Sequence, residues 1–311
     1  MPVLALLACW ASCKACNPQV NPQFETARPE TGEDETADTQ DSVIDTAPPP
    51  LCEQVEEEPN NKQDEATPIR REAEACGEFT GGLDLDYYLF ETRGAGWLEI
   101  DVDAGERGSS ADVNLSLESE GGYRLTMQDG AGSADPYVLV PVAGEDSWYL
   151  TLNEERVQGD EEGFEYFFHV SEAKAPMTFD RVEAEDNDDW TTAEDLPIGE
   201  VIYGVIDDTS DRDWFKVTTP SAKGSLRVEV VAHRKGSPLD ARMFLWKETK
   251  EGELADEAEE MFETNPFDVG LDPAFERTGG GNEVWYLQVL RLEGGAGPLY
   301  WYTLSVTEVS E

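Results

Sequence analysis

The chain has 311 residues, which is enough for two domains of ordinary size beside unstructured segments. It carries 68 acidic and 22 basic side chains, so its formal net charge at pH 7 is −46. Such a charge repels polyanions, which argues against nucleic acid and anionic lipid surfaces as partners. The same field concentrates cations, and bound metal or external salt would relieve the self-repulsion of the compact state.

A short apolar run opens the chain, is too short to span a bilayer and is followed by no second hydrophobic segment. We interpret residues 1–16 as an export leader, with a misplaced start codon or an atypical leader explaining the missing basic n-region. The tetrapeptide at residues 6–9, LLAC, resembles a bacterial lipobox and makes Cys9 the predicted lipidation site. Cys13 or Cys16 could be modified instead, or an ordinary leader could be cleaved elsewhere.

Residues 17–50 are acidic and rich in Thr, Pro, Asp and Glu. Such a segment buries too little apolar surface to offset the entropy of chain ordering. We therefore predict a disordered acidic stalk between the cell envelope and the folded part.

The rest of the chain contains a duplication with an offset of 127 residues. The matching pairs are Glu56 with Glu183, Glu58 with Glu185, Asn60 with Asn187, Gly77 with Gly204, Asp84 with Asp211, and Asp86 with Asp213. The offset drifts to 128 and then 137 further on, as small loop insertions would produce. We predict one domain over residues 51–174 and a second over residues 175–311.

Apolar residues alternate within each copy, which is typical of half-buried strands. The alternating sets include Leu98, Ile100 and Val102, then Tyr149 and Thr151, and in the second copy Leu226, Val228 and Val230. Gly- and Asp-rich turns separate these segments, and the pattern predicts an all-β chain with a β-sandwich in each copy. Residues 251–262 allow one short helix, but we expect an acidic excursion between strands there.

Two spaced motifs recur in register in the two copies. The second copy has Glu-Ala-Glu-Asp-Asn-Asp at residues 183–188 and Asp-Arg-Asp-Trp-Phe at residues 211–215, and the first copy keeps the same frame from Glu56 and from Asp84. This sequence resembles the bacterial pre-peptidase C-terminal (PPC) domain family and, through it, the collagen-binding modules of secreted bacterial collagenases. The resemblance covers about residues 52–310 and implies two tandem jelly-roll-like sandwiches without catalytic activity.

The resemblance also implies calcium, which the first motif and the Asp-rich turn chelate in the collagen-binding modules. Alternate residues of an extended segment direct their oxygens to one side, as the oxygen-rich coordination of calcium requires. The implied ligands in the second copy are Glu183, Glu185, Asn187, Asp188 and Asp213, with Asp211 or Ser210 at the remaining turn position. The first copy offers Glu56, Glu58, Asn60, Asn61 and Asp86, with Asp84 as an auxiliary ligand.

The first copy has Thr80 and Gly81 where the second has Asp207 and Asp208, so we expect its calcium site to be weaker. In a chain this acidic, the alternative is that these carboxylates form only a solvated face.

Cys52 and Cys76 are the cysteines that lie outside the leader, and Phe179 and Tyr203 occupy their positions in the second copy. A pair that is cysteine in one copy and aromatic in the other indicates two residues in contact, here joined by a disulfide. Such a bridge fits export to an oxidising compartment. Two unpaired buried thiols are the alternative.

The sequence contains no HExxH motif, no Gly-x-Ser-x-Gly elbow and no phosphate-binding loop, and nothing singles out a pair of its many carboxylates for catalysis. We therefore expect no enzymatic activity. The leading hypothesis is an exported envelope lipoprotein that binds another protein or extracellular matrix. The alternatives are a carbohydrate-binding accessory protein and a non-catalytic pair of modules associated with a secreted hydrolase, although the leader and stalk leave no room for a catalytic domain.

Overall fold

The computed structural model describes residues 52–81, 84–130, 133–154, 164–176, 178–249, 252–255, 259–261 and 272–309. The predicted leader, Cys9 and the acidic stalk lie outside the described residues. Within the described residues the chain is all-β, with short 3-10 helices as its helical elements, and no helix there is long and apolar enough to cross a membrane.

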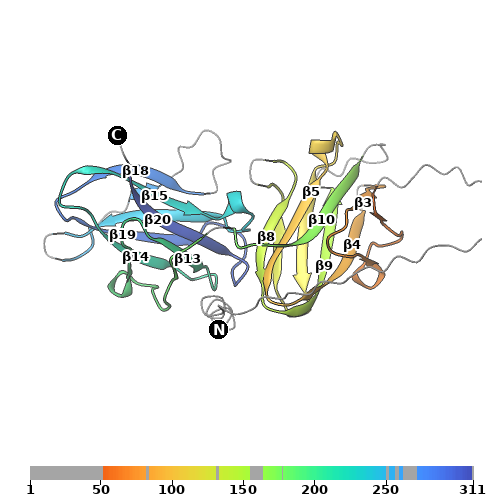
Figure 1. Cartoon of the computed structure of the whole chain (residues 1–311), viewed down its shortest axis with the longest axis horizontal. Coiled ribbons are helices and arrows are strands. Elements are labelled where there is room, and N and C mark those ends of the chain that lie inside the picture. Colours follow the sequence, from red (N-terminus) through yellow and green to blue (C-terminus); the bar gives the residue numbers. More distant parts are fainter. Residues whose placement is uncertain are drawn as a thin grey trace, which may run out of the picture. The chain divides into compact units, whose positions relative to one another are not determined.

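The first half of the folded chain forms two five-stranded sheets that pack as a sandwich (Figure 1). One sheet has the order β1-β3-β10-β5-β8 and the other β2-β4-β9-β6-β7. The strands are β1 (Gln54–Val55), β2 (Thr67–Pro68), β3 (Ala75–Glu78), β4 (Leu85–Arg93), β5 (Gly96–Asp103), β6 (Val113–Ser119), β7 (Arg124–Met127), β8 (Tyr137–Val142), β9 (Glu145–Glu154) and β10 (Glu165–Ala173), with 3-10 helices η1 (Gln63–Glu65) and η2 (Gly105–Arg107).

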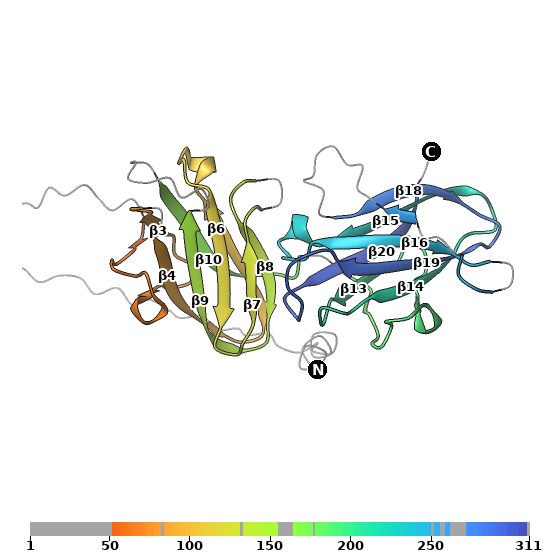
Figure 2. The same ribbon diagram turned by 180° about the vertical axis from the view of Figure 1, so that it is seen from behind.

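The second half repeats this topology strand for strand, since its sheets have the orders β11-β13-β20-β15-β18 and β12-β14-β19-β16-β17 (Figure 2). Its strands are β11 (Arg181–Val182), β12 (Glu194–Asp195), β13 (Val201–Val205), β14 (Asp213–Thr218), β15 (Gly224–Val231), β16 (Ala241–Lys247), β17 (Glu259–Met261), β18 (Ala274–Gly279), β19 (Val284–Arg291) and β20 (Trp301–Val309), with η3 (Trp190–Thr192) and η4 (His233–Lys235). The prediction of two tandem β-sandwiches is confirmed.

The core of each sandwich consists of the inward set of each alternating strand. In β5 and β15 these are the predicted residues, among them Ile100 and Val228, which are fully buried. In β9 the alternation has the opposite phase: Trp148 and its alternate neighbours are buried, whereas Tyr149 and Thr151 face outward. Both sets contain aromatic or β-branched residues, so periodicity alone did not identify the buried face.

Residues 251–262 are the segment for which the sequence allowed a short helix. The described part of this segment has no helix, and it contains β17, which pairs antiparallel with β16. The absence of a helix in the described part agrees with the prediction, whereas β17 places a strand where an excursion between strands was expected.

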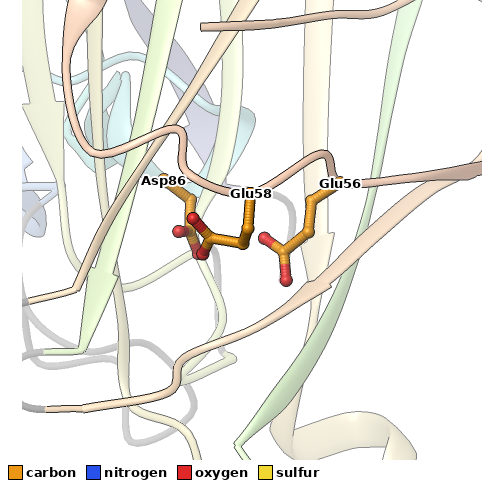
Figure 3. Close-up of side chains that lie close together, drawn as sticks. All are labelled: Glu56, Glu58 and Asp86. Atoms are coloured by element: carbon orange, nitrogen blue, oxygen red, sulfur yellow. The ribbon is translucent and has the colours of Figure 1, made fainter. Parts of the chain in front are cut away.

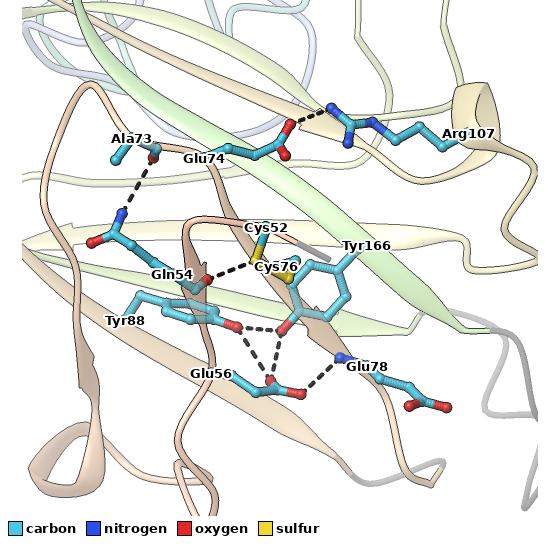
Figure 4. The surroundings of a disulfide bond; sticks show 10 residues. All are labelled: Cys52, Gln54, Glu56, Ala73, Glu74, Cys76, Glu78, Tyr88, Arg107 and Tyr166. Carbon is cyan, nitrogen blue, oxygen red and sulfur yellow. Dashed lines mark hydrogen bonds and ion pairs between the residues drawn. A yellow bond between two sulfur atoms is a disulfide. The ribbon is translucent and has the colours of Figure 1, made fainter. Parts of the chain in front are cut away.

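The first sandwich contains a disulfide between Cys52 and Cys76, which joins the segment before β1 to β3 (Figure 4). At the equivalent positions of the second sandwich the rings of Phe179 and Tyr203 lie 5.1 Å apart. The two pairs therefore perform the same task, since each holds the short first strand of its sandwich against the third.

Removal of the disulfide should lower the free energy of unfolding of the first sandwich by about 3 kcal/mol, because the closed loop of 24 residues restricts the unfolded chain. Urea denaturation of a Cys52→Ser, Cys76→Ser double variant measures this loss. A Cys52→Phe, Cys76→Tyr double variant, which copies the second sandwich, should lose less. Equal stability of the serine variant and the wild type would contradict the assigned role.

Candidate cation sites

Three carboxylate side chains of the second sandwich converge. Glu183, Glu185 and Asp213 each offer an oxygen atom, and these atoms lie within 4.8 Å of one another. Glu183 directly follows β11, and Asp213 is the first residue of β14, so the three side chains come from both sheets of the sandwich. Glu183 and Asp213 are buried, and Glu185 is exposed. We call this group the second acidic cluster.

Backbone pairing fixes Glu183 at this place. Its N–H donates to the carbonyl of Tyr203, and its Oε1 accepts a hydrogen bond from the N–H of Val205 at 2.6 Å. The Tyr302 hydroxyl of β20 lies 2.8 Å from Oε2 of Glu183 and 2.6 Å from Oδ2 of Asp213. Because a tyrosine hydroxyl carries one hydrogen, it can donate to only one of these carboxylates. The other needs a proton or a cation.

Gly204 makes room for this tyrosine. A Cβ atom at Gly204 would lie 2.3 Å from Cζ of Tyr302. At the equivalent Gly77, a Cβ atom would lie 2.3 Å from the hydroxyl of Tyr166 and 2.4 Å from Oε2 of Glu56. The glycine of each repeat is thus required by the close approach of a tyrosine to the acidic cluster.

Asn187 contributes an amide that has no partner. Its side chain is fully buried, and neither Oδ1 nor Nδ2 has a hydrogen-bond partner among the described residues. Its backbone N–H donates to the Glu185 carboxylate, and its carbonyl accepts from the N–H of Trp214. Oδ1 of Asp213 is also buried without a partner. Each unpaired buried polar atom costs about 1–3 kcal/mol, which a bound cation would offset at both oxygens.

The first sandwich repeats the arrangement with Glu56, Glu58 and Asp86, whose oxygens also lie within 4.8 Å of one another (Figure 3). We call this group the first acidic cluster. The N–H of Glu78 donates to Glu56, as that of Val205 does to Glu183. The buried amide of Asn60 and Oδ1 of Asp86 lack partners, as do their counterparts in the second sandwich.

Two tyrosines surround the first acidic cluster, where the second has one. The Tyr166 hydroxyl lies 3.2 Å from Oε2 of Glu56 and 2.6 Å from the hydroxyl of Tyr88 (Figure 4). It also lies 2.5 Å from Oδ2 of Asp86. The Tyr88 hydroxyl is in turn 3.3 Å from Oε2 of Glu56. The extra phenol adds a donor to the carboxylates of the first cluster.

The sequence prediction missed Tyr166 and Tyr302. The two tyrosines align in the last strands of the two copies, and the paired glycines mark a close approach in both. These patterns connect the tyrosines to the carboxylates only when the strand pairing is known.

Four further predicted ligands lie next to the acidic clusters and support turns there, and the carboxyl group of one of them, Asp211, also contacts that of Asp213. Asp188 and Asn61 accept from the backbone N–H of Arg212 and Leu85, respectively. Asp211 accepts from the N–H of Asp207, and Asp84 from the N–H and hydroxyl of Thr80, so each closes the turn before β14 or β4. Ser210, the alternative turn ligand, donates to Asp208. The backbone hydrogen bonds of Asp188 and Asn61, and those of Asp211 and Asp84, are equivalent in the two copies.

Burial and mutual repulsion make the clusters strong proton acceptors without a cation. Burial raises the pKa of Glu183 to about 8 and that of Glu185 to about 7, with neighbouring carboxylates adding to both shifts. The pKa of Asp213 is raised well above its usual range for the same reasons. In the first cluster burial raises the pKa of Asp86 to about 8 and also raises that of Glu56.

The donor atoms define the kind of ion that would fit. Each cluster offers carboxylate oxygens and contains no histidine or cysteine, and the asparagine two residues after its second glutamate has a buried amide oxygen without a partner. Hard divalent cations such as calcium and magnesium prefer oxygen ligands, whereas zinc and copper favour imidazole and thiolate. The clusters therefore suit a hard cation that would tie the first motif to the strand that follows the turn.

The raised pKa values predict a pH dependence. In a chelator, the free energy of unfolding should fall as the pH rises from about 4.5 to about 8, because the folded state binds protons that the unfolded state has already released. The fall should exceed about 1.4 kcal/mol, the equivalent of one pKa unit. Urea denaturation in EDTA across this pH range measures it.

The high net charge also weakens the compact state as the pH rises, so a matched variant is needed. Asp213→Asn removes one buried titrating group and changes the total charge little, and it should flatten the curve. A slope that this variant leaves unchanged would assign the pH dependence to general repulsion and not to the acidic cluster.

The fold and the repeated clusters define a tandem β-sandwich protein with an acidic, oxygen-lined cluster in each sandwich. No protein-family model and no curated protein matches the sequence. The chain is structurally similar to the pre-peptidase C-terminal domain of a collagenase from Bacillus anthracis, with 17% sequence identity and a TM-score of 0.25, over 37% of this chain and 93% of that one.

Two tandem-module structures are also similar to it. The CBM22-1–CBM22-2 tandem of Paenibacillus barcinonensis Xyn10C has 11% identity and a TM-score of 0.22, over 72% of this chain and 91% of that one. The tandem CBM51 modules of Sp3GH98 from Streptococcus pneumoniae have 9% identity and a TM-score of 0.20, over 76% of this chain and 83% of that one.

Proposed function

We propose that the chain is an exported, non-catalytic binding protein with two PPC-like modules, residues 51–174 and 175–311, each of which binds calcium at its acidic cluster. The observation that carries the proposal is the repeated cluster: in each sandwich three carboxylates converge, and the asparagine whose backbone N–H donates to one of them has a buried side-chain amide without a partner. One such group has a local explanation in a strongly acidic chain. Two such clusters at the same sequence offset, supported by the same backbone hydrogen bonds, favour the same kind of ligand in each sandwich.

Calcium suits the geometry better than magnesium. Calcium accepts irregular sets of oxygen ligands, whereas magnesium demands near-octahedral geometry and keeps several waters. The residues that would hold calcium in the second module are Glu183, Glu185, Asn187 and Asp213, and in the first they are Glu56, Glu58, Asn60 and Asp86. The charge of the ion would replace the protons that these carboxylates otherwise retain near neutral pH.

The disulfide supports an extracytoplasmic location, since such bonds persist in oxidising compartments. In this proposal Cys9 carries a lipid anchor, the stalk extends from the membrane, and the calcium-rigidified modules bind another protein or extracellular matrix. Carbohydrate is the second class of partner, and association with a secreted hydrolase is the alternative setting.

Replacement of one ligand should stabilise the protein in the absence of calcium and destabilise it when calcium is present. Asp213→Asn removes a buried charge, so in EDTA near pH 8 the variant should be more stable than the wild type. In calcium the variant should be less stable, because it loses the binding energy at one site, about 2.7 kcal/mol when the ion is present at 100 times its Kd. Thermal melts in both buffers measure the reversal.

Calorimetric titration with calcium supplies the stoichiometry. The wild type should bind an ion in each module, Asp213→Asn should lose the site of the second, and Asp86→Asn that of the first. Glu308→Gln, which neutralises an exposed carboxylate of β20, is the matched control and should bind as the wild type does. Absence of saturable calcium binding to the wild type would contradict the proposal.

A further inference from the structure

The first sandwich has a groove on the outer face of its sheet β2-β4-β9-β6-β7, opposite the core. Its volume is about 410 Å³, and its walls come from β4, β6, β7 and β9 together with η1. Asp86 and Tyr87 are neighbours on β4, but Asp86 is buried with the first acidic cluster, whereas Tyr87 lines the groove. The groove and the cation site are therefore separate places on the same strand.

The strand register arranges the groove as a grid. Tyr87 pairs with Thr151, Thr151 with Ser116, and Ser116 with Thr126, so one row crosses four strands with small hydroxyl side chains in its middle. Adjacent strands lie about 4.8 Å apart, which gives this row a length of roughly 14 Å. The small residues form the floor of the groove.

The next row along the strands supplies larger side chains. It pairs Tyr149 with Glu118 and Glu118 with Arg124, and the last two form an exposed ion pair with a distance of 2.7 Å. Tyr87 and Tyr149 are both half-buried, so part of each ring faces solvent beside the hydroxyl floor. The wall of the groove thus combines aromatic surface with charged hydrogen-bonding groups.

The second sandwich shows that the fold does not require a small residue at the position of Ser116. At the same grid positions Ser116 is replaced by Phe244, Glu118 by Trp246 and Tyr87 by Trp214. The rings of Trp214 and Trp246 lie 5.8 Å apart, and Trp214 is buried. The same sheet therefore accepts large aromatic residues on its outer face, and only the first sandwich has an open hydroxyl floor at these positions.

The lining chemistry selects the class of ligand. Hydroxyl, amide and charged side chains offer hydrogen bonds to a polyol, and tyrosine rings pack against the apolar faces of sugar rings. Among the described lining residues, exposed aliphatic surface comes from Leu85 at the end of the groove, which disfavours an apolar helix or peptide. The net charge of −46 and the carboxylate of Glu118 disfavour an anionic polymer.

We propose that this groove binds a neutral oligosaccharide. Tyr87 and Tyr149 pack against sugar rings, while Ser116, Thr126 and Thr151 on the floor and Asn153 beside them bond to sugar hydroxyls. The ligand crosses the four strands along the row and does not contact the first acidic cluster. The first sandwich then recognises the partner, whereas the outer face of the second is closed by its own aromatic residues.

Calorimetric titration of the full chain in calcium, with cellohexaose, xylohexaose, mannohexaose and chitohexaose as separate probes, tests the proposal. At least one should bind saturably with a Kd of about 1 mM or tighter. Tyr149→Ala should weaken that binding about tenfold. Ser116→Phe, which copies the second sandwich, should fill the floor and weaken it as much or more, with an unchanged melting temperature and unchanged calcium binding.

The reciprocal change Phe244→Ser is the matched control and should leave sugar affinity unchanged. Absence of saturable binding to all four probes would overturn the proposal, and so would binding that Tyr149→Ala and Ser116→Phe do not affect. Saturable binding of a neutral proline- and glycine-rich peptide that Ser116→Phe abolishes, with no sugar binding, would assign the groove to a polypeptide instead. Calcium binding is measured in the same variants. A wrong assignment of the groove can therefore be distinguished from a wrong assignment of the cation sites.

Discussion

The structure of each sandwich depends on two carboxylates, at least one of them buried, that share one tyrosine hydroxyl. Tyr302 lies within hydrogen-bond distance of both Glu183 and Asp213, yet it has a single hydrogen to donate. Two charged carboxylates cannot stay buried so close together without compensation, because desolvation and repulsion both oppose it. Without metal a bound proton can compensate up to about pH 8, because burial and repulsion raise the pKa of Glu183 to about 8, and a hard cation could replace that proton.

This constraint couples the two layers of the sandwich. Glu183 follows β11 and Tyr302 lies on β20, which belong to one sheet, whereas Asp213 begins β14 in the other. A cation held by these residues would therefore join both sheets at one edge, where β11, with only two residues, has little pairing of its own. In the first sandwich the disulfide strengthens the same short edge, and in the second the Phe179–Tyr203 ring contact does.

The sequence predicted the parts of this arrangement that repeat along the chain. The constant offset identified two copies, alternation identified strands, and the motif spacing identified the carboxylates that converge. It did not separate Glu183, Glu185 and Asp213 from Asp188 and Asp211, because all five are acidic and only strand pairing decides which oxygens point inward. Tyr166 and Tyr302 escaped prediction for a related reason, since they reach the clusters from the last strand through contacts that are distant in sequence.

The two copies have diverged more on one surface than on the other. Around the acidic clusters the pairs Gly77 and Gly204, Asn60 and Asn187, and Tyr166 and Tyr302 keep their identity, and their contacts match. On the outer face of the second sheet, the row of Tyr87, Thr151, Ser116 and Thr126 in the first sandwich corresponds to Trp214, Gln288, Phe244 and Glu260 in the second. Substitution of one residue at an acidic cluster would leave a buried carboxylate without compensation for its charge. Residues on an outer face do not depend on one another in this way. The acidic cluster therefore constrains the frame of both modules, and the outer face is where one module could acquire a ligand that the other does not bind.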